Sequence, residues 1–493
     1  MGKTMITNAI LFLILCSFAF IPLALGEYAR GRSVLSTEDF FLQGRKLGLF
    51  TMYATTFATW MSAFAFMGGI TYIYEQGPIY MTTIGWDALF AVLFVVLGRR
   101  IWHYGKVHHY TTPTDFFSDI YDSKALNLLV TAITVICTLV YLQVQIVGGL
   151  QVMVVATGGL VRWYAGGIIF FAILVIYLWA GGLRAIALTD IFYGVLMVTA
   201  ILSSGVFLIK TAGGTEAVFT ELIQRDPANV SMIGENSGQS ALRWISLFII
   251  VPTGAFLGPQ IWIRNYAAVS EKNFNGLPLL LYISSIVCVG TLLAGSASIV
   301  MAEDASDPGT VLIQLLRCHA GPFFQAFIIV GIYASIFSTA NSQIHALSTV
   351  YTVDIYRKYI NNKAPDRKQV SVAKWMVLLV SVLSYILMIL IPQSIFDLAI
   401  MAMGGSAQLL IPLLGALFWK RSTAAAAVAG LLCGEGAFFA TAIIIRWDSS
   451  ICGLLGMLVN LAFFIFFSLI DRPRTTVFRK IERYKREYRQ RGY

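Results

Sequence analysis

Long apolar stretches make up most of the chain, and short polar segments separate them. A helix needs about 20 apolar residues to cross the hydrocarbon core of a bilayer. Thirteen stretches are long and apolar enough to predict such helices, and we number them spans 1 to 13. They lie near residues 6–26, 47–73, 79–98, 125–157, 163–183, 187–209, 242–262, 277–302, 322–352, 371–391, 394–418, 424–445 and 451–470.

The composition agrees with this pattern. Of the 493 residues, 58% are hydrophobic and 12% are charged, and the mean hydropathy is +0.75. A soluble domain has about 25% charged residues, so lipid must be the solvent for much of this surface. The longest polar stretch, residues 211–241, is too short for a domain of its own. The sequence therefore predicts an all-α integral membrane protein.

The basic residues are distributed unevenly between the loops. With the N-terminus outside, 28 of the 35 Lys and Arg fall in segments on the inner side. Loops rich in Lys and Arg stay in the cytoplasm, so the pattern predicts a multi-pass protein of the cell (plasma or inner) membrane with a cytoplasmic C-terminus. The tail, residues 471–493, would lie beside the anionic inner leaflet. The net charge of +10 therefore does not indicate nucleic-acid binding.

The start of the chain has a second interpretation. Ala24-Leu25-Gly26 resembles the small-residue site of a cleaved signal peptide. The apolar run before it is long for a signal, and the loop after it is basic. A retained first span is therefore favoured over a cleaved signal.

Span 2 contains residues that can interrupt a membrane helix. It carries four hydroxyl side chains at mid-depth and then Gly68-Gly69; the hydroxyls belong to Thr55, Thr56, Thr59 and Ser62. An interrupted helix frees backbone groups in the membrane, where a polar solute needs partners. Close packing of small residues explains the same pattern equally well.

Span 7 shows a stronger signal for interruption. Pro252, Gly254, Gly258 and Pro259 all lie inside it, and each proline removes a backbone hydrogen bond. Spans 2 and 7 are five spans apart. Interrupted first helices in two five-helix halves, inverted because five is odd, are typical of LeuT-type transporters.

This pattern divides the chain into segments. Residues 47–210 would form the first five-helix repeat and residues 242–421 the second, with the extracellular loop 211–241 between them. Residues 1–46 would hold the first span and a cytoplasmic loop. Residues 422–470 would hold two peripheral spans, and residues 471–493 the basic tail.

Span 9 carries a dense group of hydroxyl and amide side chains. Ser335, Ser338, Thr339, Asn341 and Ser342 follow one another in an otherwise apolar helix. A hard cation prefers several oxygen ligands. The hydroxyls of span 9 and carbonyls released by span 2 would supply them. Hydrogen bonding between helices is the alternative interpretation.

Six short motifs in this order resemble those of the sodium:solute symporter family, and the likeness runs from about residue 39 to residue 421. They are Asp39-Phe-Phe-Leu-Gln-Gly-Arg45, Ala58-Thr-Trp-Met61-Ser62, Gly181-Gly-Leu-Arg-Ala-Ile-Ala-Leu-Thr189-Asp190, Gly258-Pro-Gln-Ile-Trp-Ile-Arg264, Phe337-Ser-Thr-Ala-Asn-Ser-Gln343 with Asp354-Ile-Tyr356, and Leu417-Phe-Trp-Lys-Arg421. The family includes proline, pantothenate, sialic acid and sugar symporters.

The resemblance implies sodium-coupled symport of a small polar organic solute by alternating access, with Na+ as the coupling ion and no organic cofactor. It implies one sodium site made by the carbonyls of Ala58, Met61 and Ser335 and the hydroxyls of Ser338 and Thr339. Asp190 matches an aspartate on the inward exit path of sodium; capping the start of span 6 is its alternative role. Tyr193 and Trp60 depart from the family pattern, where glutamine and, in proline transporters, aspartate stand.

Further polar and aromatic residues are candidates for the solute pocket. Asp87 lies inside span 3, where a carboxylate is costly unless it is solvated or paired. We expect it either to line the outer cavity or to reach the outer interface. The other candidates are Ser62, Phe64, Phe66, Thr253, Phe256, Ser406 and Gln408. Glu435 in span 12 lies outside the expected core and is assigned to packing.

The remaining residues give no sign of enzyme chemistry. The six cysteines are scattered singly and are expected to be small buried hydrophobes. His103, His108 and His109 lie in a basic loop without a metal-binding pattern. We therefore expect a transporter, monomeric in the bilayer, that binds a small solute. A proton-coupled or sodium-independent permease and a transporter-derived sensor are the alternatives. Amino acids, monocarboxylates, vitamins and sugar acids all stay open as solutes.

Overall fold

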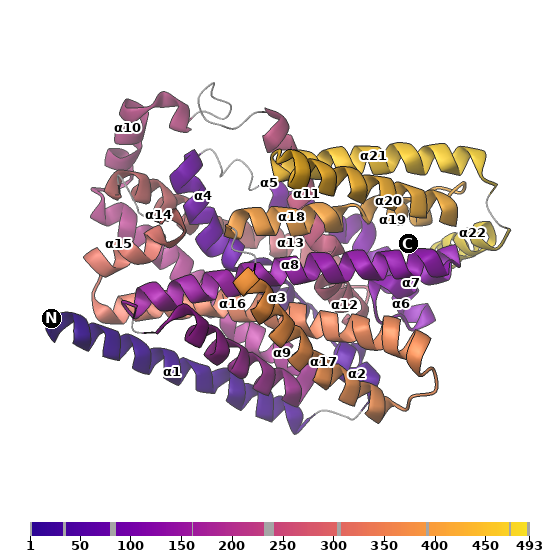
Figure 1. The fold of residues 1–493 in the computed structure, drawn as a ribbon, viewed down its shortest axis with the longest axis horizontal. Coiled ribbons are helices and arrows are strands. Elements are labelled where there is room, and N and C mark those ends of the chain that lie inside the picture. Colours follow the sequence, from indigo (N-terminus) through magenta and orange to yellow (C-terminus); the bar gives the residue numbers. More distant parts are fainter. Residues whose placement is uncertain are drawn as a thin grey trace.

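A computed structural model describes residues 2–32, 36–78, 85–159, 161–230, 241–302, 307–390, 394–472 and 475–490. Within these residues the chain is almost entirely helical, with one isolated β-bridge between Leu47 and Ala268. Most long helices run along the long axis of the molecule, which is horizontal in Figure 1. The prediction of an all-α membrane protein is confirmed.

The helices follow one another with short connections. The first nine are α1 (Gly2–Arg30), α2 (Thr37–Leu42), α3 (Leu49–Trp60), α4 (Gly69–Gln76), α5 (Gly85–Leu93), α6 (Arg99–His108), α7 (Pro113–Tyr121), α8 (Lys124–Ala156) and α9 (Trp163–Thr211). The next seven are α10 (Thr215–Arg225), α11 (Ala241–Leu257), α12 (Pro259–Ala267), α13 (Asn273–Ile283), α14 (Cys288–Met301), α15 (Val311–His319) and α16 (Pro322–Val350). The last six are α17 (Asp366–Leu390), α18 (Ile395–Ala407), α19 (Leu410–Phe418), α20 (Ala424–Phe439), α21 (Ser449–Ile470) and α22 (Thr475–Gln490).

Short 3-10 or π-helical segments extend or join several of these helices. They are η1 (Gln43–Arg45), η2 (Phe64–Gly68), η4 (Phe94–Gly98), η5 (Pro227–Val230), η6 (Ser284–Val287), η7 (Pro308–Thr310), η8 (Tyr351–Ile360) and η9 (Ala440–Ile445). Several expected spans therefore combine α-helix with a short 3-10 or π-helical segment. In the described part of the chain, eight helical segments are long and apolar enough to cross a membrane, or nine if the bent pair α11 and α12 is one span. The count of thirteen spans stays a prediction.

Spans 5 and 6 form the single long element α9, which turns sharply at Gly182. This residue has φ 54° and ψ −145°, a conformation that favours glycine. A Cβ there would also lie 2.5 Å from the Phe40 carbonyl. Glycine at this position therefore lets the chain reverse direction while it touches α2.

The centre of the molecule is formed by α16 and α18. In each, 83% of the apolar window is buried, compared with 28% for the span that contains α20. Helix α16 packs against α8, α9 and α3, while α20 packs mainly against α21. The hydroxyl-rich helix predicted as span 9 therefore lies in the core, and the helices of spans 12 and 13 lie at the periphery (Figure 1).

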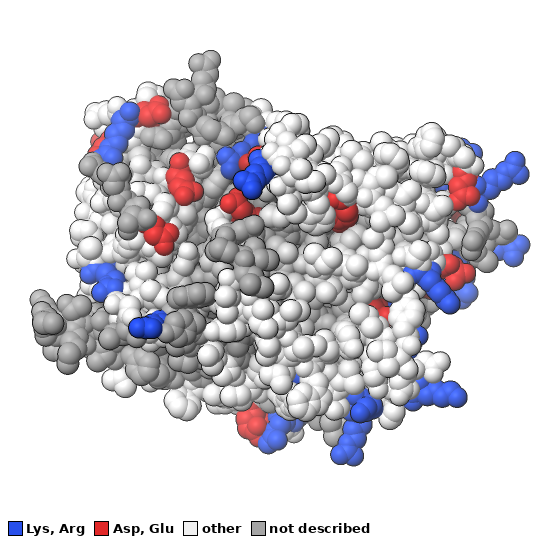
Figure 2. Space-filling view, in the orientation of Figure 1, with Lys and Arg blue, Asp and Glu red and all other residues white. Residues whose placement is uncertain are grey.

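One end of the molecule, on the right in Figures 1 and 2, carries α6, α7 and α22 and a concentration of Lys and Arg; we call it the basic end. The C-terminal helix α22 is docked there against α7. The Lys480 ammonium donates a hydrogen bond of 3.1 Å to the Asp119 carboxylate. The hydroxyls of Tyr484 and Tyr110 donate to the same carboxylate. The basic tail is thus held by one partly buried acidic side chain as well as by its overall charge.

The charge state of Asp119 controls this contact. Burial raises the pKa of the Asp119 carboxyl, but the hydrogen bonds from Tyr110, Tyr484 and Lys480 outweigh burial and leave the pKa below its ordinary value. The folded state therefore favours the carboxylate. Its contribution to docking is present at neutral pH and is lost as the pH falls through the lowered pKa.

Asp119→Asn is expected to loosen α22, because the amide loses the ion pair with Lys480 and is a weaker acceptor for the two tyrosines. Amide hydrogen exchange measured by mass spectrometry should become about tenfold faster over residues 475–490, which corresponds to about 1.4 kcal/mol. Glu487→Gln is the matched control, since Glu487 pairs with Arg483 on α22 itself. Equal exchange in both variants would show that Asp119 does not hold the helix.

Candidate functional site

Helix α3 ends in the middle of the protein, as the sequence predicts for span 2. Its last residue is Trp60, and Met61 has φ −78° and ψ 73°, outside the helical region. The helical conformation resumes at Ala63 and continues through η2 into α4. The interruption predicted from residues 58–62 is therefore confirmed.

The break releases two backbone carbonyls. In a continuous helix, the amides of Ser62 and Ala63 would donate to the carbonyls of Ala58 and Thr59. Instead, the Ser62 amide donates to the Trp60 carbonyl, and the Ala63 amide donates to the Gln145 side chain at 3.1 Å. Ala58 and Thr59 therefore need partners from another element.

Helix α16 supplies these partners. The Ser338 hydroxyl donates to the Ala58 carbonyl at 2.7 Å, and the Thr339 hydroxyl donates to the Thr59 carbonyl at 3.1 Å. Both hydroxyls also lie within 3.2 Å of the Ser335 carbonyl. All of these side chains are buried. Two hydroxyl and three carbonyl oxygens thus converge where α3 breaks, and we call this group the oxygen cluster.

The oxygen cluster contains four of the five residues expected to bind sodium. These are Ala58, Ser335, Ser338 and Thr339. In the described part of the chain, no α16 hydroxyl is bonded to the carbonyl of Met61, the fifth. The Thr59 carbonyl, which the sequence reasoning did not select, occupies the corresponding place. A buried set made only of oxygens suits a hard cation such as sodium.

A second layer of polar residues lies next to this cluster. The Arg264 guanidinium, from α12, is 1% exposed and donates to the hydroxyls of Thr55 at 2.8 Å and Ser342 at 2.6 Å. It forms an ion pair with Asp190 of α9 at 3.3 Å. Thr55 also donates a hydrogen bond to Asp190. We call these four residues, from four different helices, the Arg264 layer.

The two layers are directly bonded. The Ser342 hydroxyl donates to the Ser338 carbonyl at 2.9 Å and lies 3.0 Å from the Thr59 hydroxyl. Thr55 precedes Ala58 in α3 and Ser342 follows Ser338 in α16, so the Arg264 layer lies on the side toward the start of α3. The sequence reasoning identified Asp190 but not its partner. The signal was available, because an arginine in a broken membrane span must be paired or solvated.

Further contacts close the same side of the protein. The Arg45 guanidinium is buried and donates to the backbone carbonyls of Tyr110 at 2.9 Å and Tyr266 at 3.3 Å. Leu47 and Ala268, which follow η1 and α12, form the isolated β-bridge at this level. The path from the oxygen cluster to the basic end is therefore filled by bonded side chains and backbone.

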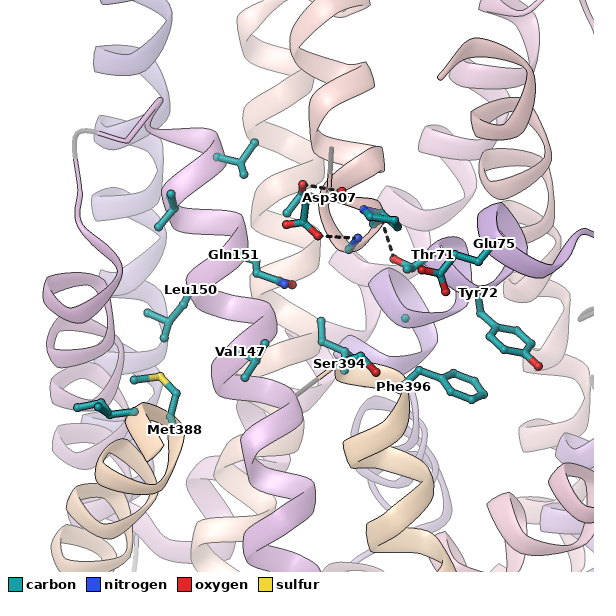
Figure 3. Close-up of a pocket in the computed structure, with 18 residues that line it drawn as sticks. Thr71, Tyr72, Glu75, Val147, Leu150, Gln151, Asp307, Met388, Ser394 and Phe396 are labelled. Atoms are coloured by element: carbon teal, nitrogen blue, oxygen red, sulfur yellow. Dashed lines mark hydrogen bonds between the residues drawn. The ribbon is translucent and has the colours of Figure 1, made fainter. Parts of the chain in front are cut away.

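The opposite side opens into a cavity of about 840 Å³ (Figure 3). It lies between α4, the C-terminal part of α8, η7 and the start of α18. Gly68 and Val147 line it. Gly68 follows the break in α3 closely in sequence, and Val147 follows Gln145, whose side chain accepts a hydrogen bond from the Ala63 amide at the break. The cavity thus leads toward the oxygen cluster from the end opposite the basic end.

Span 7 is also interrupted, and the break lies at Gly258 rather than at Pro252. Helices α11 and α12 meet at an angle of 55°, and Gly258 lies between them. Pro252 remains inside α11 without ending it. Pro259 stands at the first turn of α12, where its missing amide hydrogen is not needed.

None of the eight expected solute-pocket residues lines the open cavity. Ser62 is buried with its hydroxyl 3.1 Å from that of Tyr141, and the Phe64 ring lies 5.5 Å from Phe396, a cavity residue. Phe66, Thr253, Phe256 and Ser406 are buried.

Two of these residues, Asp87 and Gln408, form hydrogen bonds with residues that do not line the cavity. Asp87 neither lines the cavity nor reaches the surface, because it is buried and accepts a 2.7 Å hydrogen bond from the Trp60 indole. Gln408 is directed at a peripheral helix: its side chain donates to the Gly453 carbonyl at 3.2 Å, and Asn460 donates to its backbone carbonyl at 2.8 Å. Its expected role as a pocket wall is therefore not supported by its contacts.

The Sodium:solute symporter family model matches residues 40–434. The sodium/pantothenate symporter of Haemophilus influenzae is 25% identical over 433 residues, which cover 85% of this chain and 86% of that protein. The osmoregulated proline transporter OpuE of Bacillus subtilis is 25% identical, with 84% and 85% covered. A sodium/proline symporter of Staphylococcus aureus is 26% identical, with 88% and 84% covered.

Solved structures give the same fold. The substrate-bound outward-open state of a Na+-coupled sialic acid symporter superposes with a TM-score of 0.83 at 18% identity, covering 94% of this chain and 98% of that one. The nucleobase-cation-symport transporter Mhp1 in a closed conformation gives a TM-score of 0.62 at 12% identity, with 90% and 98% covered. The expected LeuT-type arrangement of inverted repeats is therefore confirmed.

Arg264→Met is expected to destabilise the protein by about 3–5 kcal/mol, because it leaves the Asp190 carboxylate buried without its cation. Adding Asp190→Asn should recover part of this loss, since the second change removes the uncompensated charge. Thermal unfolding of the purified protein measures both effects. Arg225→Met, which removes an exposed ion pair with Glu221, is the control and should change little. Equal loss in the single and double variants would argue against coupling within the Arg264 layer.

Proposed function

The chain belongs to the sodium:solute symporter family, and from this premise we propose that it imports a small polar organic solute together with sodium by alternating access. The curated relatives are symporters, and sodium is the coupling ion that the family implies. Amino acids, carboxylates and vitamin-like compounds are the solute classes considered. A proton-coupled or sodium-independent permease and a transporter-derived sensor are not favoured by these relatives.

The oxygen cluster is the observation that carries the proposal. The proposed sodium ligands are the Ser338 and Thr339 hydroxyls and the carbonyls of Ala58 and Ser335, with Met61 from the family pattern. The Thr59 carbonyl joins them on the basis of its contact with Thr339. When sodium binds, the two hydroxyls turn their protons away from the α3 carbonyls and present lone pairs to the ion. Sodium then takes over the link between α3 and α16.

This link explains how sodium and solute would assist one another. The residues beyond the break, including Ser62 and Phe64, lead to the cavity and are the proposed floor of the solute site. If sodium fixes the break, it also fixes that floor, so each ligand raises the affinity for the other by the same factor. The remaining candidates, among them Phe66, Asp87 and Thr253, are buried and would hold these floor residues in position.

Release requires the other side to open. The Arg264 layer lies between the oxygen cluster and the basic end, and we propose that its separation forms the inner gate. Asp190 would then face the departing sodium ion, as the family pattern implies. Because Arg264 bridges α12, α3, α9 and α16, the gate opens only when these helices move apart together.

The orientation follows from charge. Lys and Arg are concentrated at the basic end (Figure 2), so we propose that this end is cytoplasmic and that the N-terminus is outside. Sodium then moves inward along the membrane potential, which contributes about 2.3 kcal/mol per charge for each 100 mV. Residues 47–210 and 242–421 remain the proposed five-helix repeats.

Ser338→Ala and Thr339→Ala should each raise the sodium concentration for half-maximal uptake about tenfold or more, because losing one ligand costs about 1.4 kcal/mol or more. Uptake into proteoliposomes with a sodium gradient is the measurement, once a solute has been found by thermal-shift screening.

Ser348→Ala is the matched control for these variants. Ser348 is a buried hydroxyl on the same helix, and it donates only to the His345 carbonyl of its own helix. It should leave the sodium requirement unchanged. Uptake by Ser338→Ala that keeps the normal sodium dependence would remove the basis for this ion site.

A further inference from the structure

The cavity opposite the basic end has a composition that the transport cycle does not explain. Its walls on the side of α8 and of the segment before α18 are mostly apolar, whereas the α4 and η7 side is polar (Figure 3). The apolar residues on these walls are Val147, Leu150, Val154 and Val155 of α8 and Met388 and Ile389 of α17, and Ile395 and Phe396 of α18 also line the cavity. A solute in this cavity would therefore contact one apolar wall and one wall that carries polar groups.

Two lining residues carry a charge, and both are acidic. They are Glu75 at the end of α4 and Asp307 before η7, and no described Lys or Arg lines the cavity. Two arginines lie just outside the lining. The Arg243 guanidinium is 5.3 Å from the centre of the Tyr72 ring and is ion-paired with Asp448 at 2.9 Å. Arg317 donates a hydrogen bond to the Val155 carbonyl. Among the described residues, the charged side chains that line the cavity itself are therefore acidic.

Asp307 and Gln151 form a cradle across this cavity. Gln151 extends from α8 toward Asp307 (Figure 3), and its amide oxygen is buried without a hydrogen-bond partner among the described residues. A Cβ on Gly309 would lie 3.2 Å from the Asp307 carboxylate, 3.2 Å from the Gln151 amide nitrogen and 3.4 Å from the Gln151 amide oxygen. Glycine at 309 thus keeps the space between these two side chains open.

The chemistry of the cradle favours one kind of group. Clefts lined by charges of one sign concentrate ions of the other sign, more so where the walls have a low dielectric constant. A carboxylate solute would be repelled by Glu75 and Asp307. An ammonium group has three N–H donors and a positive charge, which match a carboxylate and an amide oxygen placed on either side of it.

We propose that this cavity selects solutes that carry an ammonium group, either cationic or zwitterionic, and holds that group between Asp307 and Gln151. Simple monocarboxylates are excluded by the same charges. This inference rests on the proposed function, in that the solute is taken to enter through this cavity. It narrows the solute to amines, with an apolar body facing α8.

The first test measures the charge preference of the cavity directly. Thr71 lines the cavity, and its hydroxyl donates to the Pro308 carbonyl at 3.2 Å. Thr71→Cys is made in full-length protein in which the exposed Cys318 is replaced by Ser. The cationic reagent 2-(trimethylammonium)ethyl methanethiosulfonate should label Cys at position 71 about tenfold faster than its anionic sulfonatoethyl analogue, relative to the ratio for a free thiol in solution.

Asp307→Asn in the Thr71→Cys protein should reduce this preference at least threefold. Glu221→Gln, a carboxylate on α10 outside the cavity lining, is the control and should leave it unchanged. In a protein that keeps Thr71 and Cys318, the labelling rates of exposed Cys318 with the two reagents give the charge preference at a position outside the cavity. Equal labelling by the two reagents, or a preference that survives Asp307→Asn, would overturn the proposal.

The second test uses two pairs of probes that differ by an ammonium group in place of a hydroxyl: L-alanine against L-lactate, and ethanolamine against ethylene glycol. At constant sodium and ionic strength, at least one amine should slow labelling at position 71 and its hydroxyl partner should not. Gly309→Ala, which fills the cradle and keeps both charges, should abolish the protection.

Protection by lactate, or by neither amine, would overturn the ammonium site. Protection that survives Gly309→Ala would place the amine outside the cradle and overturn it as well. Labelling and protection require no transport. They can therefore fail while sodium-coupled uptake holds, and a failure of sodium coupling in Ser338→Ala leaves them intact.

Discussion

The structure depends on how the carbonyls released at the break in α3 are satisfied. A buried carbonyl without a partner costs several kcal/mol in a membrane, because no water is available to replace the lost bond. The Ser338 and Thr339 hydroxyls remove this cost by donating to Ala58 and Thr59. The same two bonds hold α16 in the centre of the molecule. A cation that binds there therefore acts on the contact that fixes the core, and small local changes can alter the position of a whole helix.

The Arg264 layer imposes a second constraint. A buried guanidinium has five N–H donors, and here they are distributed over Thr55, Ser342, Asp190 and the Gln260 carbonyl. Moving any one of the four helices would leave a charge or a donor unpaired in a dry environment. This couples the Arg264 layer to the oxygen cluster, because the Ser342 hydroxyl lies 3.0 Å from the Thr59 hydroxyl and donates to the Ser338 carbonyl. Local opening is thereby disfavoured, and a concerted opening is the way to avoid the penalty.

The sequence was sufficient for the fold and for most of the residues of the oxygen cluster. Proline, glycine and hydroxyl residues inside apolar spans act on the helix that carries them, so the breaks in α3 and between α11 and α12 could be predicted locally. Contacts between helices could not, because they depend on helix rotation and packing. The contact between Thr339 and the Thr59 carbonyl, the partner of Asp87 and the contacts of Gln408 with α21 are all of this kind. Arg264 stood in a recognised motif, but only the packing of α12 against α16 and α3 brings its side chain to Asp190 of α9.

The charges along the molecule form a consistent gradient. The cavity at one end carries Glu75 and Asp307, the middle offers neutral oxygens, and the other end carries Arg264, then Arg45 and the basic tail. In the proposed cycle, a positive ion that enters from the acidic end reaches the oxygen cluster first and then the Arg264 layer, where Arg264 is ion-paired with Asp190. If the solute carries a positive charge as well, two charges cross the membrane in each cycle. The potential then contributes about twice the 2.3 kcal/mol per 100 mV that sodium alone provides, whereas a zwitterion adds nothing. Under the proposed mechanism, the net charge of the solute thus determines how strongly the membrane potential drives uptake, and the proposed ammonium site is where that charge is selected.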